Sequence, residues 1–163
     1  MGEKPLLEVA RRMQAGESLE SIQDIPGTAF LGRNCPTGSV ALPSFEEVSQ
    51  NKAAFNQAFR QASEESNPFR GRALCQGHGN RQVIVNPPQK PLSQEEMDRI
   101  YALPFTRRPH PDYGEPIPAF IQIRHSITSH RGCFGGCSFC AIAGHQGKTI
   151  QSRSEASVLA EVN

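Results

Sequence analysis

The sequence has no tryptophan and no excess of charge of either sign. Among its 163 residues, 17 are Lys or Arg and 16 are Asp or Glu, which gives a formal net charge of +1. Proteins that bind nucleic acids or anionic membranes usually concentrate basic residues on one face, and a balanced composition gives no sign of such a surface. The charge therefore offers no support for either kind of partner.

Long hydrophobic runs are also missing. A membrane-spanning helix needs roughly 20 mostly apolar residues in a row, and no stretch of the sequence approaches that length. Residues 1–15 lack the apolar segment of a secretory signal peptide. Only 37% of the residues are hydrophobic, and 13 prolines with 14 glycines interrupt the chain often. We therefore expect a cytoplasmic protein with a modest core and no membrane partner.

What the sequence does have is a concentration of cysteine. Cys133, Cys137 and Cys140 lie within eight residues, and two glycines separate the first pair. Glycine gives such a loop the backbone freedom to curl, so that three thiolates can converge on one metal centre. A four-iron cluster held by only three thiolates keeps one iron open for a ligand, whereas electron-transfer clusters normally use four. We expect Cys35 and Cys75 to be isolated buried thiols rather than a disulfide pair.

A structural zinc site is the alternative for these cysteines. It would require a fourth ligand to close a tetrahedron, with His145 or His130 as the candidates. Zinc motifs usually bring their thiolates in C-x2-C pairs, so the spacing favours an iron–sulfur centre. Under the zinc alternative the chain is a non-catalytic binding module.

Residues 131–140, RGCFGGCSFC, resemble the signature of radical S-adenosylmethionine (radical SAM) enzymes. In that superfamily three cysteines hold a [4Fe–4S] cluster, and the fourth iron binds SAM. An electron from the cluster cleaves SAM to methionine and a 5′-deoxyadenosyl radical. The resemblance implies Cys133, Cys137 and Cys140 as the metal ligands and places Phe139 near the adenine. It also implies SAM, an electron donor and a substrate of unknown identity as partners.

A second resemblance lies in residues 86–113, NPPQKPLSQEEMDRIYALPFTRRPHPDY, which are similar to the YgiQ family of uncharacterised radical SAM proteins. This resemblance covers most of the chain. Residues 16–27 resemble the segment that ends the N-terminal domain of cobalamin-type radical SAM proteins, and the alternative for them is an ordinary surface helix and turn. By these resemblances, residues 1–27 end an upstream domain, 28–118 form a linker or subdomain, and 119–163 begin the radical SAM core. We expect His110, Asp112 and Tyr113 to be solvated or packed rather than catalytic.

Helix signals occur in four segments. Ser44 and Glu47 form a capping-box pattern at the start of the strongest one, and Ser93 is placed to cap another. The expected helices cover residues 5–15, 44–65, 94–101 and a final segment that begins near 156. We expect a buried apolar stripe in the second of these, formed by Phe45, Val48, Phe55, Ala58, Phe59 and Ala62.

The remaining patterns predict short strands and one extended connector. Strands are expected over residues 29–31 and 40–42, a hairpin over 72–76 and 82–86, a proline-rich connector over 103–118, and a strand over 119–128 that enters the cysteine loop. The fold class is therefore a mixed α+β fragment. By resemblance, it ends in the first strand, cluster loop and first helix of a truncated (β/α)6 radical SAM partial barrel. The later SAM-binding strands are expected outside it, so we expect the fragment to be inactive alone.

Overall fold

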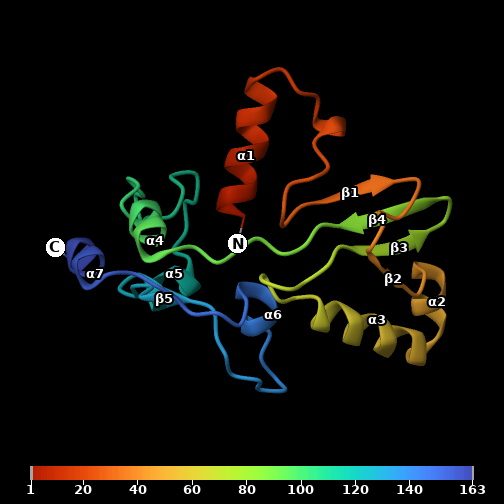
Figure 1. Ribbon diagram of the computed structural model, residues 1–163. Helices are drawn as coiled ribbons and strands as arrows, with labels where there is room; N and C mark the ends of the chain where they lie inside the picture. The colour runs from red at the N-terminus through yellow and green to blue at the C-terminus, as the bar shows by residue number, and fades with distance from the viewer. Residues whose placement is uncertain (1, 163) are drawn as a thin grey trace. The chain divides into compact units, whose positions relative to one another are not determined.

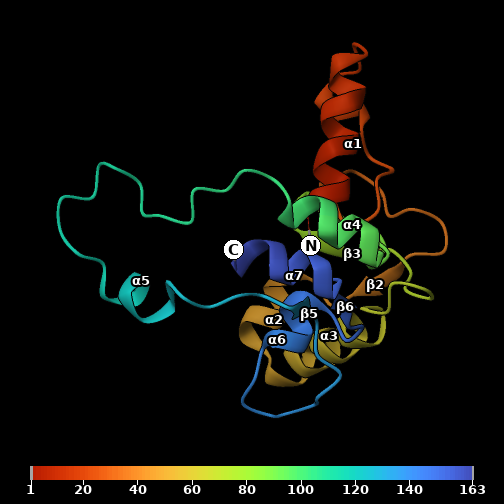
Figure 2. The same cartoon turned by 90° about the vertical axis from the view of Figure 1, so that its left-hand side faces the viewer.

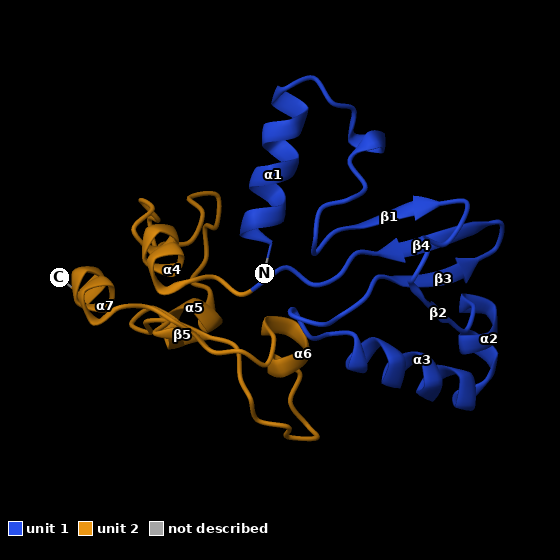
Figure 3. Cartoon of the chain, in the orientation of Figure 1, with its two compact units in different colours: residues 1–90 blue, residues 91–163 orange. Residues whose placement is uncertain are grey.

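The computed structural model describes residues 2–162, which form two compact units divided between residues 90 and 91 (Figure 3). Each unit is described by itself. The predicted domain boundaries at residues 27 and 118 stay a prediction, and residues 1 and 163 lie outside the described part. No helix among residues 2–162 is long and apolar enough to cross a bilayer.

The helices of the described residues are α1 (Glu3–Gln14), α2 (Phe45–Gln50), α3 (Lys52–Glu64), α4 (Gln94–Tyr101), α5 (Pro118–Ile123), α6 (Ile142–Gln146) and α7 (Glu155–Val162), with a 3-10 turn η1 at Leu19–Ser21. The strands are β1 (Ala29–Gly32), β2 (Val40–Leu42), β3 (Leu74–His78), β4 (Arg81–Val85), β5 (His130–Arg131) and β6 (Gln151–Ser152).

The first unit is organised around a four-stranded sheet of order β1-β4-β3-β2. β4 pairs antiparallel with both β1 and β3, whereas β2 runs parallel to β3. Parallel neighbours need a crossover connection, and α2 with α3 provides it. Figure 1 shows both helices along one side of the sheet. The predicted hairpin is confirmed as β3 and β4, and the two predicted short strands form β1 and β2 at opposite edges.

The core of the first unit lies along β4. Ile84 is fully buried there, and burial of such a side chain contributes roughly 1.5–3 kcal/mol. Ile22 and Ile25, in the segment before β1, are 7% and 4% exposed. The Asn86 side-chain amide holds that segment to the end of β4, because it donates to the carbonyl oxygens of Gln23 at 2.8 Å and of Ile25 at 3.1 Å.

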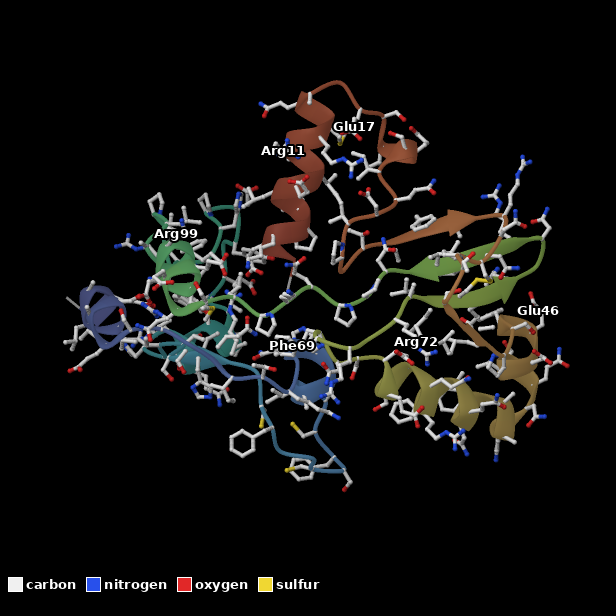
Figure 4. The ribbon with its side chains drawn as sticks, in the orientation of Figure 1. Arg11, Glu17, Glu46, Phe69, Arg72 and Arg99 are labelled. Carbon is white, nitrogen blue, oxygen red and sulfur yellow. A yellow bond between two sulfur atoms is a disulfide. The ribbon has the colours of Figure 1, made fainter. Side chains whose placement is uncertain are left out.

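We predicted isolated thiols at Cys35 and Cys75, and this prediction is wrong. The two residues form a disulfide with Cα atoms 5.7 Å apart, drawn in Figure 4 as a yellow sulfur–sulfur bond. Cys75 is buried in β3, and the loop between β1 and β2 brings Cys35 beside it. Because 40 residues separate the two cysteines, only the folded sheet brings them within disulfide distance.

The disulfide gives a stability prediction. A crosslink that closes a loop of this length removes unfolded-state entropy worth about 4 kcal/mol in the chain-entropy estimate. Cys35→Ser should therefore lower the urea midpoint of unfolding, and dithiothreitol should lower the wild-type midpoint to the same value. The variant itself should be insensitive to the reductant. A wild-type midpoint that does not respond to complete thiol reduction would refute the stabilising role.

We predicted one helix over residues 44–65, and the structure divides it at Asn51. The capping box at its start is confirmed, with reciprocal hydrogen bonds between Ser44 and Glu47. Asn51 has extended backbone angles, and its side-chain oxygen accepts from the Ala53 N–H at 2.8 Å. Asparagine is a preferred N-cap, so a second helix begins there although the apolar pattern runs on without a break.

The phenylalanines of α2 and α3 are exposed, which contradicts the predicted buried stripe. Phe45, Phe55 and Phe59 are 48%, 54% and 69% exposed. The prediction is confirmed for Ala58, which is the buried residue of α3. A small side chain allows a helix to approach a sheet closely, and the Phe45 ring instead stacks on His78 of β3 with ring centroids 4.5 Å apart.

α1 confirms the predicted first helix, which ends before Gly16 at φ +94°. The apolar stripe of this helix is not covered within the first unit. Leu6 and Met13 are 70% and 48% exposed. The helix therefore owes little of its position to burial of these side chains.

In the second unit, α4 confirms the predicted helix 94–101. Ser93 and Glu96 form a capping box, and Met97 is fully buried. Residues 103–117 contain neither helix nor strand, as predicted. Figure 2 shows this connector as a long excursion between α4 and α5.

The predicted strand over residues 119–128 is wrong, because α5 occupies its first half. Pro118 stands at the first helical position, where its missing N–H is not needed. The Ile121 N–H donates to the Ile117 carbonyl at 3.1 Å, and the Arg124 N–H donates to the Phe120 carbonyl at 2.8 Å. A helix satisfies its backbone within the segment, whereas a strand needs a neighbour. The mixed α+β fold is confirmed, and the partial barrel stays a proposal.

Candidate metal centre

The cysteine loop, residues 132–150, begins and ends at a two-stranded ladder. β5 and β6 pair antiparallel, with Arg131 opposite Gln151. Gln151 is buried, and its side-chain oxygen accepts from the Leu92 N–H at 2.7 Å. This bond attaches the base of the loop to the segment that precedes α4.

Two hydrogen bonds close the loop just inside the ladder. The Cys133 N–H donates to the Gly147 carbonyl at 3.0 Å, and the Gly132 N–H donates to the Gln146 side-chain oxygen at 3.1 Å. Gly132 has φ +86°, and a Cβ atom there would lie 2.1 Å from the Thr149 carbonyl oxygen. Only glycine fits this position, since any side chain would collide with backbone.

Substitution of Gly132 should therefore open the base of the loop. Gly132→Ala should cost at least about 1–3 kcal/mol from its backbone conformation alone, and the collision adds to that cost. Amide exchange at residues 132–150 should become faster. Gly136→Ala is the matched control, because nothing lies within 4 Å of a Cβ atom there. Equal exchange rates in the two variants would show that the close approach does not hold the loop.

The three cysteines of the predicted cluster lie on this loop as free thiols. Gly135 lies between two of them: a Cβ atom there would be 3.3 Å from the Cys133 sulfur and 3.8 Å from the Cys137 sulfur. The Gly135 N–H donates to the Cys133 sulfur at 3.4 Å. Within residues 2–162, no three His, Cys, Asp or Glu side chains are gathered closely enough to hold a metal. The three thiols thus share one loop but are not gathered at a single point in the described part of the chain.

The structure places the other predicted site residues on the surface. Phe139 is 91% exposed. Of the candidate fourth zinc ligands, His145 lies on α6, and His130 lies on β5 with Nδ1 3.0 Å from the Ser129 hydroxyl. Helix α6 itself was not among the predicted helices.

The connector residues that we expected to be non-catalytic are exposed as well. His110 and Asp112 contact each other across 3.5 Å, between Nδ1 and Oδ2. Tyr113 is 64% exposed. Their exposure agrees with a solvated role.

Sequence reasoning missed Asp98, which connects α4 to the start of α7. Its carboxylate accepts from the Ser154 N–H at 2.9 Å. Hydrogen bonds from the Ser154 hydroxyl and N–H hold the pKa of Asp98 below its usual range. The Ser154 hydroxyl also accepts from the Ser157 N–H at 3.1 Å, which caps α7. The predicted helix near 156 is therefore confirmed, with a cap that a second helix supports.

Comparison with known proteins identifies the family. The family model described as radical SAM N-terminal matches residues 1–126. A UPF0313 protein of Geobacter sulfurreducens is 59% identical over 99% of this chain and 27% of its own length. UPF0313 proteins of Methanocella arvoryzae and Clostridium botulinum are 49% and 47% identical over 99% and 100% of the chain, and over 27% and 26% of their own lengths. No solved structure matches.

The chain therefore belongs to the radical SAM proteins and, among them, to the YgiQ-like UPF0313 family. This membership confirms the resemblance found in the sequence. The chain spans 27% of the length of its Geobacter relative, so the activity of the whole protein is a matter for proposal.

Proposed function

We propose that the chain is part of a radical SAM enzyme and that Cys133, Cys137 and Cys140 hold its [4Fe–4S] cluster. The observation that carries this proposal is a loop with three free thiols whose ends are held together by backbone hydrogen bonds, in a chain of the radical SAM family. Three thiolates leave one iron available to SAM.

The residues of the loop hold the cluster and contribute to SAM binding in this proposal. The Gly135 N–H donates to the sulfur of Cys133, one of the three proposed ligands. Phe139 offers an exposed ring to the adenine of SAM. When bound, the cluster supplies the electron that cleaves SAM to methionine and a 5′-deoxyadenosyl radical.

The rest of the assignment follows the family. We propose that residues 119–163 begin the catalytic core, that 28–118 form the segment before it, and that 1–27 end an upstream domain. An electron donor and a substrate complete the reaction, and no residue of this chain is assigned to either. A cytoplasmic location is part of the proposal.

The cluster assignment predicts which cysteines are needed for iron. Anaerobic reconstitution of the full-length protein with iron and sulfide should give about four irons per chain, the content of one cubane cluster. Cys133→Ala, Cys137→Ala and Cys140→Ala should each lose most of this iron, because each removes one of three ligands. Cys35→Ser is the matched control and should retain it, since its sulfur belongs to the disulfide.

Two results would contradict the assignment. Recovery of one tightly bound zinc per chain, without acid-labile sulfide, would favour the zinc module. Loss of iron from Cys35→Ser, with the loop variants unaffected, would place the cluster elsewhere.

A further inference from the structure

Arg153 is a buried arginine at the end of the cysteine loop, between β6 and α7. Its side chain is 1% exposed. A buried guanidinium is costly unless its N–H groups are paired, because it has lost the water that would solvate its charge. The partners of Arg153 therefore show what the burial achieves.

These partners lie on both sides of the loop. On the entering side, Nη1 donates to the Thr128 carbonyl at 3.0 Å, and the backbone N–H donates to the Ser129 carbonyl at 3.0 Å. On the leaving side, Nε and Nη2 donate to the hydroxyl and carbonyl of Ser157 at 3.1 and 2.7 Å, and the guanidinium pairs with the Glu161 carboxylate. One residue thus connects the segment before the loop with the helix after it.

Tyr101 on α4 adds a second connection between the two ends. The guanidinium carbon of Arg153 lies 4.2 Å from the centre of the Tyr101 ring, and that of Arg131 lies 5.2 Å from it. Arg131 also donates from Nε to the Tyr101 hydroxyl at 3.3 Å. The ring therefore binds one arginine from each end of the loop, since Arg131 directly precedes Gly132.

The ladder alone is too short to fix the loop. β5 and β6 have two residues each, and an isolated two-stranded pairing is marginal even when longer. We propose that Arg153 and Tyr101 form a clamp that holds both ends of the cysteine loop and so positions Cys133, Cys137 and Cys140 for the cluster. This inference rests on the proposed function. Both are positioning residues, which act through the backbone of the loop.

Three substitutions in the full-length protein test the clamp. Arg153→Lys keeps the charge but loses the planar group that reaches Thr128 and Ser157 together. Tyr101→Leu removes the ring, and Tyr101→Phe removes only the hydroxyl that Arg131 contacts. Arg99→Lys is the matched control, because Arg99 is an exposed arginine on α4, the helix that carries Tyr101 (Figure 4).

Two measurements apply to each variant. The first is amide exchange of residues 132–150 in the protein without iron, and the second is the rate at which a chelator removes iron after anaerobic reconstitution. Loss of supporting contacts around metal ligands commonly weakens metal binding by about 10–100-fold. We expect about tenfold faster exchange and iron release in Arg153→Lys and Tyr101→Leu, on the scale of that effect. Tyr101→Phe should show a smaller increase, and Arg99→Lys should match the wild type.

Wild-type exchange and iron release in folded Arg153→Lys and Tyr101→Leu would overturn the clamp. Circular dichroism establishes folding, and if both variants unfold, Tyr101→Phe decides: unchanged loop exchange in it would overturn the clamp too. If the wild-type protein binds no iron, the proposed function fails, whereas the exchange rates in the iron-free protein still decide whether the clamp exists.

Discussion

The close backbone approach at Gly132 is the constraint on which the cysteine loop depends. A backbone at φ +86°, with the Thr149 carbonyl oxygen 2.1 Å from the position of a Cβ atom, admits no side chain. This approach lies between the ladder and the Cys133 N–H bond to Gly147. The two ends of the cysteine loop are thereby held together by backbone contacts that involve no thiol.

Closure at the base leaves the tip of the loop open. Cys137 and Phe139 are exposed, and the three thiols stand on a segment fixed only where it begins and ends. Metal binding usually supplies the free energy that orders such a segment, because a complete ligand set seldom exists beforehand. A loop closed at its base loses less entropy on binding than a free chain of the same length. Under the proposed function, such a loop leaves its tip accessible to iron while its base is already fixed.

The sequence predicted what local chemistry decides. The capping box at Ser44 and the cap at Ser93 marked helix starts, because their hydrogen bonds join residues three apart. The hairpin and the proline-rich connector were also predicted from local signals, namely turn residues between two short apolar runs and recurrent prolines. The cysteine spacing identified the candidate centre and, together with residues 86–113, the family.

Features set by distant partners could not be predicted in this way. The Cys35–Cys75 disulfide depends on the fold of the sheet. Residues 119–123 have the composition of a strand, yet they form a helix that begins at Pro118, because hydrogen bonds within the segment satisfy its backbone. The contacts of Arg153 join three segments, and a single arginine in the sequence carries no sign of them. Asn51 is different, since its capping preference was a local signal that the apolar pattern concealed.

Reductive cleavage of SAM is the measurement that tests the central claim most directly. The full-length protein, reconstituted anaerobically and given a strong reductant, should convert SAM to methionine and 5′-deoxyadenosine even without its substrate. Cys137→Ala, treated in the same way, should form neither product above background. A wild-type protein that holds a reducible four-iron cluster and still leaves SAM intact would contradict the account, because its cluster would then lack the open iron on which the proposed chemistry depends.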